Sequence, residues 1–281
     1  MGALDGKIAF ITGSSRGIGK ATATRFAAEG ASVVLSASRM GAHGELPGTL
    51  QEAVDEINAT GGKAAAVVCD LLNVEARTDL IARASEPFGQ IDILINNAAA
   101  GVMKLPSQIT TAERNMMFDL NVNVPVELSQ QALPSMKEKG QGWILNISSR
   151  TAELIELPYP DMPIAAWVVG AYGASKAALN RYSQIMAHEL IEHGIYVNAM
   201  SPNYICLTNV GPEVEAIAKR RPDMIEPIEM MAEAALALCS GSQVAHFCYS
   251  RDIVFTTGNK VMSLDGKTLL GDARMPGTLS S

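Results

Sequence analysis

Two short stretches of the chain carry residue types that could do chemistry together. The first is a glycine-rich turn after an apolar run, with the spacing T-G-x-x-x-G-x-G. Without a Cβ the backbone can approach a pyrophosphate closely, and the amides that open the following helix attract its negative charge. The turn therefore predicts a dinucleotide site made of Gly13, Ser14, Ser15, Arg16, Gly17, Ile18 and Gly19. A glycine-rich strand-to-helix turn that binds nothing is the alternative.

The second stretch places Tyr172 four residues before Lys176, so a helix would bring the phenol and the ammonium onto one face. A tyrosine ordinarily titrates near pH ~10, which is too high for efficient proton transfer at neutral pH, and lowering this pKa by roughly three units requires about 4 kcal/mol. A cation ~4 Å away supplies about that energy at an effective dielectric constant of ~20. The pair could therefore form an acid–base catalyst, and a surface pair that arose by chance is the alternative.

Short apolar runs alternate with amphipathic stretches along the chain. The runs predicted to be strands are 7–11, 33–35, 65–68, 91–95, 143–147, 195–199 and 260–264. The stretches predicted to be helices lie near 18–29, 48–60, 74–86, 111–138, 172–193 and 228–239. Continuous apolar strands separated by helices indicate a parallel sheet covered on both faces. Because no repeat or linker interrupts this pattern, residues 1–281 are predicted to form a single doubly wound α/β domain with about seven strands.

The chain resembles the short-chain dehydrogenase/reductase family, because further motifs follow the glycine turn in the order that the family has. These motifs are Asn96-Asn97-Ala98-Ala99, Leu120-Asn121-Val122, Asn146-Ile147-Ser148-Ser149 and Tyr172-Gly173-Ala174-Ser175-Lys176. They extend the resemblance from about residue 5 to residue 266. The resemblance implies a Rossmann-type fold and hydride transfer between a nicotinamide cofactor and a carbonyl or alcohol substrate.

The resemblance also implies a role for each catalytic residue. Tyr172 would be the general acid and base, while Lys176 would hold the nicotinamide ribose and lower the pKa of Tyr172. Ser149 would hydrogen-bond the substrate oxygen, and Asn121 would hold a water that links Lys176 to bulk solvent. Ser149 stands third after the strand asparagine, as the family's catalytic serine does, and Ser148 is the alternative. The cofactor contacts implied elsewhere are Asp70, Leu71, Asn97, Ala98, Ala99, Pro202 and Ile205, beside Tyr172 and Lys176.

Three features depart from the family pattern. Tyr172 follows Ser149 at a longer interval than usual, and the extra residues fall in the loop 150–171, which we expect to reshape a wall or lid of the substrate pocket. Ala99 stands where the family has glycine. Asn203 also replaces a glycine, and since asparagine tolerates a positive φ we expect cofactor binding to survive this change. Thr208 lies one residue away from the family's usual threonine, and we assign it no role.

The residues after the second strand favour NADP(H) over NAD(H). NAD-specific members usually end this strand with an acidic residue that bonds the ribose hydroxyls, but the corresponding position here is Ala37. Arg16 and Arg39 could instead clamp a 2′-phosphate, and Ser14 and Ser38 could add hydroxyl donors. The alternative is that the two arginines are simply solvated. For the loop 39–47, the alternative is a surface excursion without a function.

The composition limits the binding partners and the cell compartment that are expected for the chain. With a formal net charge of -7 and no basic cluster, the chain is not expected to bind nucleic acid or an anionic membrane. The four cysteines are scattered, so neither disulfides nor a metal site are predicted. The N-terminus lacks the pattern of a signal peptide, and no apolar run is long enough to span a bilayer. We therefore expect a cytoplasmic protein.

The expected pocket segments are 100–106, 150–171 and 203–212. They carry Met103, Leu154, Ile155, Leu157, Tyr159, Met162, Trp167, Tyr204 and Ile205. An apolar ketone or secondary alcohol is the predicted substrate, although these side chains could equally pack the loops. The alternatives are an acyl-thioester ketoreductase and a non-catalytic NADP-binding sensor. The sensor is disfavoured because Tyr172 and Lys176 are both present.

The family commonly forms homodimers or homotetramers through two long helices, here about 111–138 and 172–193.

Overall fold

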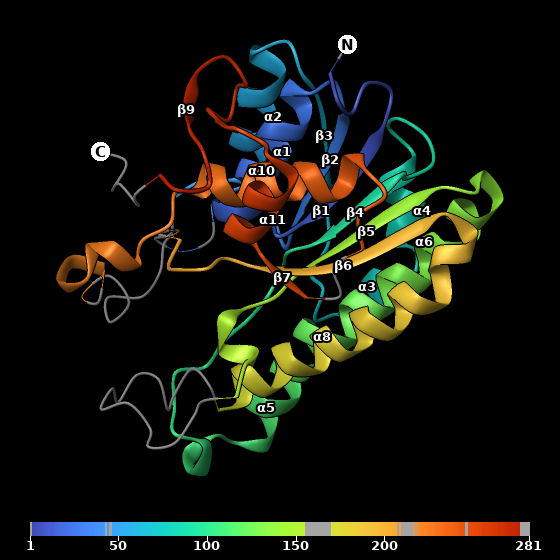
Figure 1. The fold of residues 1–281 in the computed structure, drawn as a ribbon. Helices are drawn as coiled ribbons and strands as arrows, with labels where there is room; N and C mark the ends of the chain where they lie inside the picture. The colour runs from blue at the N-terminus through green and yellow to red at the C-terminus, as the bar shows by residue number, and fades with distance from the viewer. Residues whose placement is uncertain are drawn as a thin grey trace.

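The computed structural model describes residues 2–42, 44, 47–154, 170–206, 208, 216, 218–244 and 247–275. Within these residues, seven parallel strands form one sheet with helices on both faces (Figure 1). In order across the sheet the strands are β3 (Lys63–Val68), β2 (Ser32–Ala37), β1 (Ile8–Thr12), β4 (Ile93–Asn96), β5 (Gly142–Ile147), β6 (Ile195–Ser201) and β7 (Cys248–Tyr249). The strand order reverses between β1 and β4, where α/β sheets bind their ligands. The predicted Rossmann-type α/β fold is confirmed.

The central strands are apolar along their length because both faces of the sheet are covered. In β1, Ala9 and Ile11 belong to the core on one face, and Phe10 between them belongs to the core on the other. Every residue of β5 is buried. Since side chains alternate along a strand, a strand inside such a sheet needs apolar residues at nearly every position. The sequence runs that predicted the first six strands have this character.

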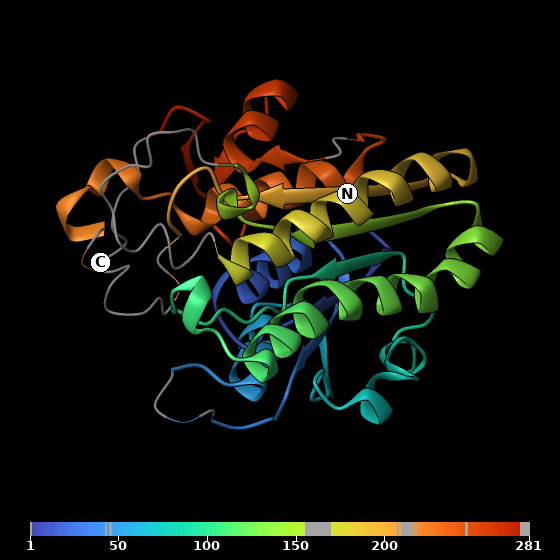
Figure 2. The ribbon, with the colours of Figure 1, turned by 90° about the horizontal axis from the view of Figure 1, so that it is seen from below.

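Different helices cover the two faces of the sheet. The core on one face is completed by α1 (Gly17–Ala28), α2 (Leu50–Ala59), α10 (Ile228–Ser240) and α11 (Ser250–Thr257). The opposite core is completed by α4 (Leu80–Ser85), α6 (Val124–Lys139) and α8 (Ala171–Leu190), which face the viewer in Figure 2. None of the helices in the described part of the chain is long and apolar enough to cross a membrane.

Two predicted helices are interrupted in the structure. The predicted helix 74–86 divides into α3 (Val74–Arg77) and α4, and the predicted helix 111–138 divides into α5 (Thr111–Phe118) and α6. Between α5 and α6 lies one π-helical turn, η2 (Asp119–Asn123). Single π turns inside helices occur frequently at functional sites. The described 3₁₀ turns are η1 (Pro106–Gln108), η3 (Arg150–Ala152), η4 (Ile191–His193) and η5 (Pro222–Met224).

The seventh strand of the sheet is not the one that the sequence predicts. The run 260–264 was predicted to complete the parallel sheet, but its strand β8 (Val261–Met262) pairs antiparallel with β9 (Leu269–Gly271) in a separate hairpin. The seventh strand is β7, which pairs with the last two residues of β6. Val261 is fully buried against the core. The run 260–264 is therefore apolar because it packs on the core, although its strand does not pair with the parallel sheet. β7 has only two residues, too few to show any periodicity. Helix α11, which follows it, was not predicted.

Candidate active site

The glycine turn lies at the carboxyl end of β1 and leads into α1. Gly13 and Gly17 have φ angles of 61° and 58°, in the left-handed region that favours glycine. A Cβ on Gly13 would lie 2.9 Å from the Cα of Ala98, and one on Gly19 would lie 2.6 Å from the carbonyl oxygen of Gly13. The turn is therefore folded tightly against the end of β4. The N-cap residue Arg16 makes no side-chain capping bond, so its side chain does not occupy the amides that open this helix.

Asn97 ties the end of β4 to this turn. Its Nδ2 donates to the carbonyl oxygens of Thr12 and Gly13, both at 2.9 Å. In return the hydroxyl of Thr12 accepts from the amides of Asn97 and Ala98 at 3.0 and 3.1 Å. The Asn97 side chain thus shapes the turn from within the protein. Ala99, the next residue but one, is exposed at the edge of the sheet.

Ser14 does not have the role that the sequence predicts. Its hydroxyl was expected to donate to a phosphate, but it is fully buried and donates to the carbonyl oxygen of Ile11 at 2.8 Å. It also accepts from the amide of Ser36 at 2.9 Å, while its own amide donates to the Ser36 carbonyl oxygen. Ser14 therefore joins β1 to β2. Ser15 beside it is buried, and Ile18 packs against the core.

The residues predicted to select the cofactor lie together at the carboxyl ends of β1, β2 and β3. Ser38 and Arg39 are exposed just after β2. Arg16 donates to the carbonyl oxygen of Pro47 at 3.3 Å in an exposed contact. Asp70 is also exposed and accepts from the amide of Leu72 at 3.1 Å. Leu71, which lies between Asp70 and Leu72, is 8% exposed. The structure thus leaves two arginines accessible on the side of the turn where β2 ends.

Tyr172 lies in the first turn of α8 and reaches Ser149, the second residue after β5. Its phenol shares a hydrogen bond with Ser149, and its ring packs beside Gly101, where a Cβ would lie 3.3 Å from the ring carbon Cδ2. Burial raises the pKa of Tyr172, and the Ser149 hydroxyl lowers this pKa by less. The phenol therefore keeps its proton at neutral pH. Gly101 was not predicted, although it lies in the segment 100–106 that the sequence assigned to the pocket.

The two adjacent serines have different partners. Ser148 is buried and donates to the Oδ1 of Asn180 at 2.5 Å. The hydroxyl of Ser149 accepts from the amide and the hydroxyl of Thr151, at 3.2 and 2.9 Å. Because Ser149 is the one that meets the phenol of Tyr172, the structure brings the preferred serine of the two into the site.

Lys176 lies one helical turn after Tyr172 and is 2% exposed. Its Nζ donates to the carbonyl oxygen of Ile147 at 2.7 Å and lies 5.9 Å from the centroid of the Tyr172 ring. Burial lowers the pKa of Lys176 to about 7. The pKa of Tyr172 is raised here, and the groups that shift it are its burial and the Ser149 hydroxyl, so the predicted lowering by Lys176 is not seen in this arrangement.

Asn121 lies in the π turn and holds this end of α8 in place. Its Nδ2 donates to the carbonyl oxygen of Ala100 at 2.8 Å and to the hydroxyl of Ser175 at 2.9 Å, and its Oδ1 accepts from the Ala100 amide at 2.9 Å. Ser175 in turn donates to the carbonyl oxygen of Tyr172 at 2.7 Å. A chain of hydrogen bonds therefore runs from the segment after β4 to the turn that carries Tyr172. Ser175 was missed by the sequence reasoning, although it stands between the two residues of the Tyr–Lys motif.

The segment after β6 returns to the glycine turn. Ile205 pairs with Ile225, with its amide bonded to the carbonyl oxygen of Met224 at 2.8 Å. Further along, the Cβ of Thr208 lies 3.2 Å from the position that a Cβ on Gly17 would take. Pro202 is half-buried at the end of β6. The predicted cofactor residues of this segment thus lie on the same edge as the turn.

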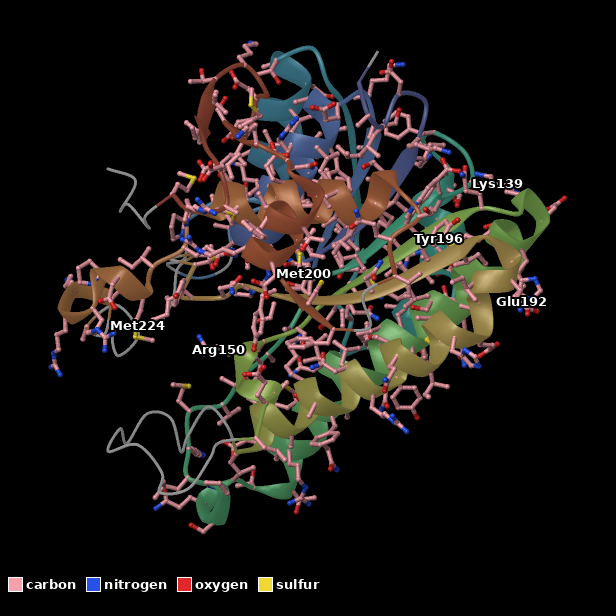
Figure 3. The ribbon with its side chains drawn as sticks, in the orientation of Figure 1. Lys139, Arg150, Glu192, Tyr196, Met200 and Met224 are labelled. Carbon is pink, nitrogen blue, oxygen red and sulfur yellow. The ribbon has the colours of Figure 1, made fainter. Side chains whose placement is uncertain are left out.

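The predicted pocket wall is described only in part. Met103, Tyr204 and Leu154 are 41%, 38% and 99% exposed. The other apolar residues predicted in the loop 150–171, from Ile155 to Trp167, lie outside the described residues. Figure 3 shows Arg150 and Met224 at the carboxyl edge of the sheet, with Lys139 and Glu192 at the opposite end. The site residues therefore gather at the edge marked by Arg150.

Comparisons with known proteins agree on one family. The family described as short chain dehydrogenase matches residues 7–217. The 7alpha-hydroxysteroid dehydrogenase of Escherichia coli K12 is 36% identical over 244 residues, covering 84% of this chain and 88% of that protein. A solved 7alpha-hydroxysteroid dehydrogenase, complexed with NADH and 7-oxo glycochenodeoxycholic acid, has a TM-score of 0.74 at 34% identity, with 88% and 92% of the chains covered. A 3-oxoacyl (acyl-carrier-protein) reductase from Agrobacterium tumefaciens C58 with NADP bound has a TM-score of 0.73 at 29% identity, with 88% and 93% covered.

Proposed function

The chain belongs to the short-chain dehydrogenase family and is an oxidoreductase that acts on CH–OH groups. On this premise we propose that it transfers a hydride between NADP(H) and an apolar ketone or secondary alcohol. The observation that carries the proposal is the hydrogen bond between the phenol of Tyr172 and Ser149, one helical turn from the buried amine of Lys176. A site of this kind offers a proton donor and an oxygen-binding hydroxyl at one point.

The residues of the chain have separate tasks in this proposal. When bound, a nicotinamide cofactor supplies or accepts the hydride. Ser149 hydrogen-bonds the substrate oxygen, and Tyr172 gives its proton to that oxygen or takes one from it. The raised pKa of Tyr172 keeps the phenol protonated at neutral pH, which is the form that reduction of a ketone needs. Asn121 fixes the helix end through Ser175, and its proposed water link to Lys176 belongs to the same hypothesis.

The glycine turn fits a dinucleotide cofactor. Its backbone is packed so closely that a Cβ on Gly19 would lie within 2.6 Å of its neighbours, and its helix amides have no side-chain cap from Arg16. Gly13 to Gly19 would hold the pyrophosphate, with Lys176 on the ribose of the nicotinamide half. Asp70 and Leu71 would meet the adenine, and Ala98, Ala99, Pro202 and Ile205 would line the nicotinamide half.

NADP(H) is the proposed cofactor because the half-buried Arg16 and the exposed Arg39 stand where the adenosine ribose would lie. Replacing Arg39→Ala should raise the Kd of NADPH about tenfold, the loss of one charged contact, and leave that of NADH unchanged. Titration of both cofactors by fluorescence measures this difference. Lys63→Ala, an exposed cation at the start of β3, is the matched control. Tighter binding of NADH than NADPH by the parent protein would refute the cofactor assignment.

The catalytic assignment is tested with Tyr172→Phe. We expect this variant to bind NADPH like the parent and to lose turnover by about 10²–10⁴-fold, because only the proton donor is removed. A panel of apolar ketones and alcohols, followed by the absorbance of the reduced nicotinamide, provides the assay. Tyr182→Phe, on the exposed side of the same helix, should keep full activity. Undiminished turnover in Tyr172→Phe would show that another group transfers the proton.

The remaining proposals concern the substrate, the assembly and the location of the protein. An apolar substrate is proposed from the exposed Met103 and Tyr204 at the carboxyl edge. An acyl-thioester ketoreductase is the second candidate, supported by the likeness to the 3-oxoacyl reductase, and the substrate panel separates the two. We also propose a single domain, a homo-oligomer and a cytoplasmic location. The four buried cysteines Cys69, Cys206, Cys239 and Cys248, all free thiols, suit a reducing compartment.

A further inference from the structure

Glu226 is a buried carboxylate that the catalytic group does not use. It is 1% exposed and stands between η5 and α10. Its Oε2 accepts from the amide of Asn203 at 3.0 Å, and its Oε1 accepts from the hydroxyl of Ser250. The guanidinium of Arg251 lies 3.6 Å from Oε2. One side chain thus joins the segment after β6 to the first turn of α11.

Asn203 completes the connection with its own side chain. Its Oδ1 accepts from the amide of Arg251 at 2.9 Å and lies 3.4 Å from the oxygen of the Ser250 hydroxyl, whose proton is directed to Glu226. The N-cap residue of α11, Tyr249, provides no side-chain cap, so Asn203 satisfies this helix end from another part of the chain. A glycine at this position, as the family has, could not do so. The replacement of glycine by Asn203 is therefore explained by the helix that follows β7.

The same segment is held on two further sides. The carbonyl oxygen of Asn203 accepts from Nη1 of Arg150 at 3.2 Å, and Arg150 directly follows Ser149. The carbonyl oxygen of Ile205 accepts from the amide of Glu226 at 2.9 Å. Backbone and side chain of Glu226 therefore hold both ends of the stretch 203–205. Burying a carboxylate is unfavourable unless hydrogen bonds compensate it, and here the compensating groups all belong to this one stretch and to α11.

We propose that Glu226 and Asn203 are positioning residues that fix the segment after β6 against the nicotinamide half of the cofactor. The inference rests on the proposed function, in which Pro202 and Ile205 line that half. Glu226 holds the backbone of the segment, and Asn203 anchors it to α11. Neither side chain touches the reacting atoms, so their loss should change cofactor affinity more than the rate of proton transfer.

Glu233 offers a matched control on the same helix layer. It is also buried, at 2% exposed, and pairs with Arg25 at 2.7 Å and with the amide of Met262 at 3.2 Å. This pair joins α1, α10 and β8 and involves no residue of the segment after β6. Glu233→Gln therefore reproduces the loss of a buried charge without the proposed positioning role.

The experiment compares Glu226→Gln, Asn203→Gly and Glu233→Gln in the full chain. We expect Glu226→Gln to raise the Kd and KM of NADPH about tenfold, the equivalent of one charged hydrogen bond, with kcat within about twofold of the parent. Asn203→Gly should raise the Kd by about threefold, because a neutral hydrogen bond is lost. Glu233→Gln should lower Tm but leave the Kd of NADPH unchanged.

Two results would overturn the inference. One is a Glu226→Gln variant that loses Tm to the same extent as Glu233→Gln while its Kd stays within twofold of the parent. If Glu226→Gln does not fold, Asn203→Gly decides, and an unchanged Kd in that variant overturns the inference. A parent protein that binds neither NADPH nor NADH instead refutes the proposed function itself, before any variant is compared.

Discussion

Arg77 and Lys176 are both buried basic side chains, but their surroundings differ. Arg77 forms paired hydrogen bonds to Asp119 at 2.8 and 3.0 Å and to Glu127 at 2.7 and 3.1 Å. Hydrogen bonds to Asp119, followed by those to Glu127, raise the pKa of Arg77 despite its burial. Among the described residues, the one hydrogen-bond acceptor of the Lys176 amine is the carbonyl oxygen of Ile147, and burial lowers the pKa of Lys176 to about 7.

The difference separates a structural charge from a reactive one. A buried cation that is fully paired stays charged and fastens the elements around it, here α3, the π turn and α6. A buried cation without a carboxylate partner changes its protonation near neutral pH, which is the property that catalytic sites use. Asp119, one of the two partners of Arg77, also opens the π turn that carries Asn121.

The largest expected effect comes from removing the reactive cation. Lys176→Met should lower kcat/KM by about 10²–10³-fold, since it removes the amine that holds the nicotinamide ribose and so orients the cofactor beside Tyr172. Steady-state kinetics with NADPH and a ketone accepted by the parent measure the loss. Lys7→Met, whose amine lies over the ring of Trp143 at the other end of the sheet, should remain as active as the parent. Equal activity of Lys176→Met and Lys7→Met would show that Lys176 has no role in the reaction.

The paired cation should matter for stability instead. Arg77→Met leaves Asp119 and Glu127 without their partner, and because these carboxylates are 26% and 39% exposed, water compensates part of the loss. We expect the free energy of unfolding to fall by about 2–3 kcal/mol in urea denaturation. Arg83→Met, which breaks a pair with the exposed Asp79 and hydrogen bonds to the carbonyl oxygens of Val68 and Ala76, should cost less than Arg77→Met. The comparison fails if the two arginine variants are equally stable.

A smaller effect should appear in the dependence of stability on pH. The unfolded chain holds a proton on Lys176 up to its ordinary pKa of 10.5, whereas the folded protein releases it near pH 7. Between these values the unfolded state binds more protons, so this group makes the folded protein more stable as pH rises, by at most about 1.4 kcal/mol per pH unit. In Lys176→Met this contribution disappears. Urea denaturation of both proteins at pH 7.5 and 8.5 tests the sign. An identical pH dependence would show that Lys176 stays charged in the folded protein.

The fold was predictable where the signals are local. The apolar runs and the glycine turn predicted six strands and the entry to α1, because alternation and turn geometry are properties of neighbouring residues. The seventh strand was not predictable, since β7 has two residues and Val261 carries the apolar signal for burial elsewhere. The π turn at Asn121 also escaped, because it depends on hydrogen bonds to Ala100 and Ser175, which lie in other segments.

The sequence by itself determined the class of chemistry: the order of its motifs pointed to Tyr172, Lys176 and Ser149 and to a nicotinamide cofactor. Only the tertiary structure decided how those groups are placed and protonated. It separated Ser149 from Ser148, committed the Ser14 hydroxyl to Ile11 and made Lys176 titrate near neutral pH. The physical reason is that residue type and spacing are written locally, whereas burial and hydrogen-bond partners come from segments far apart in the chain.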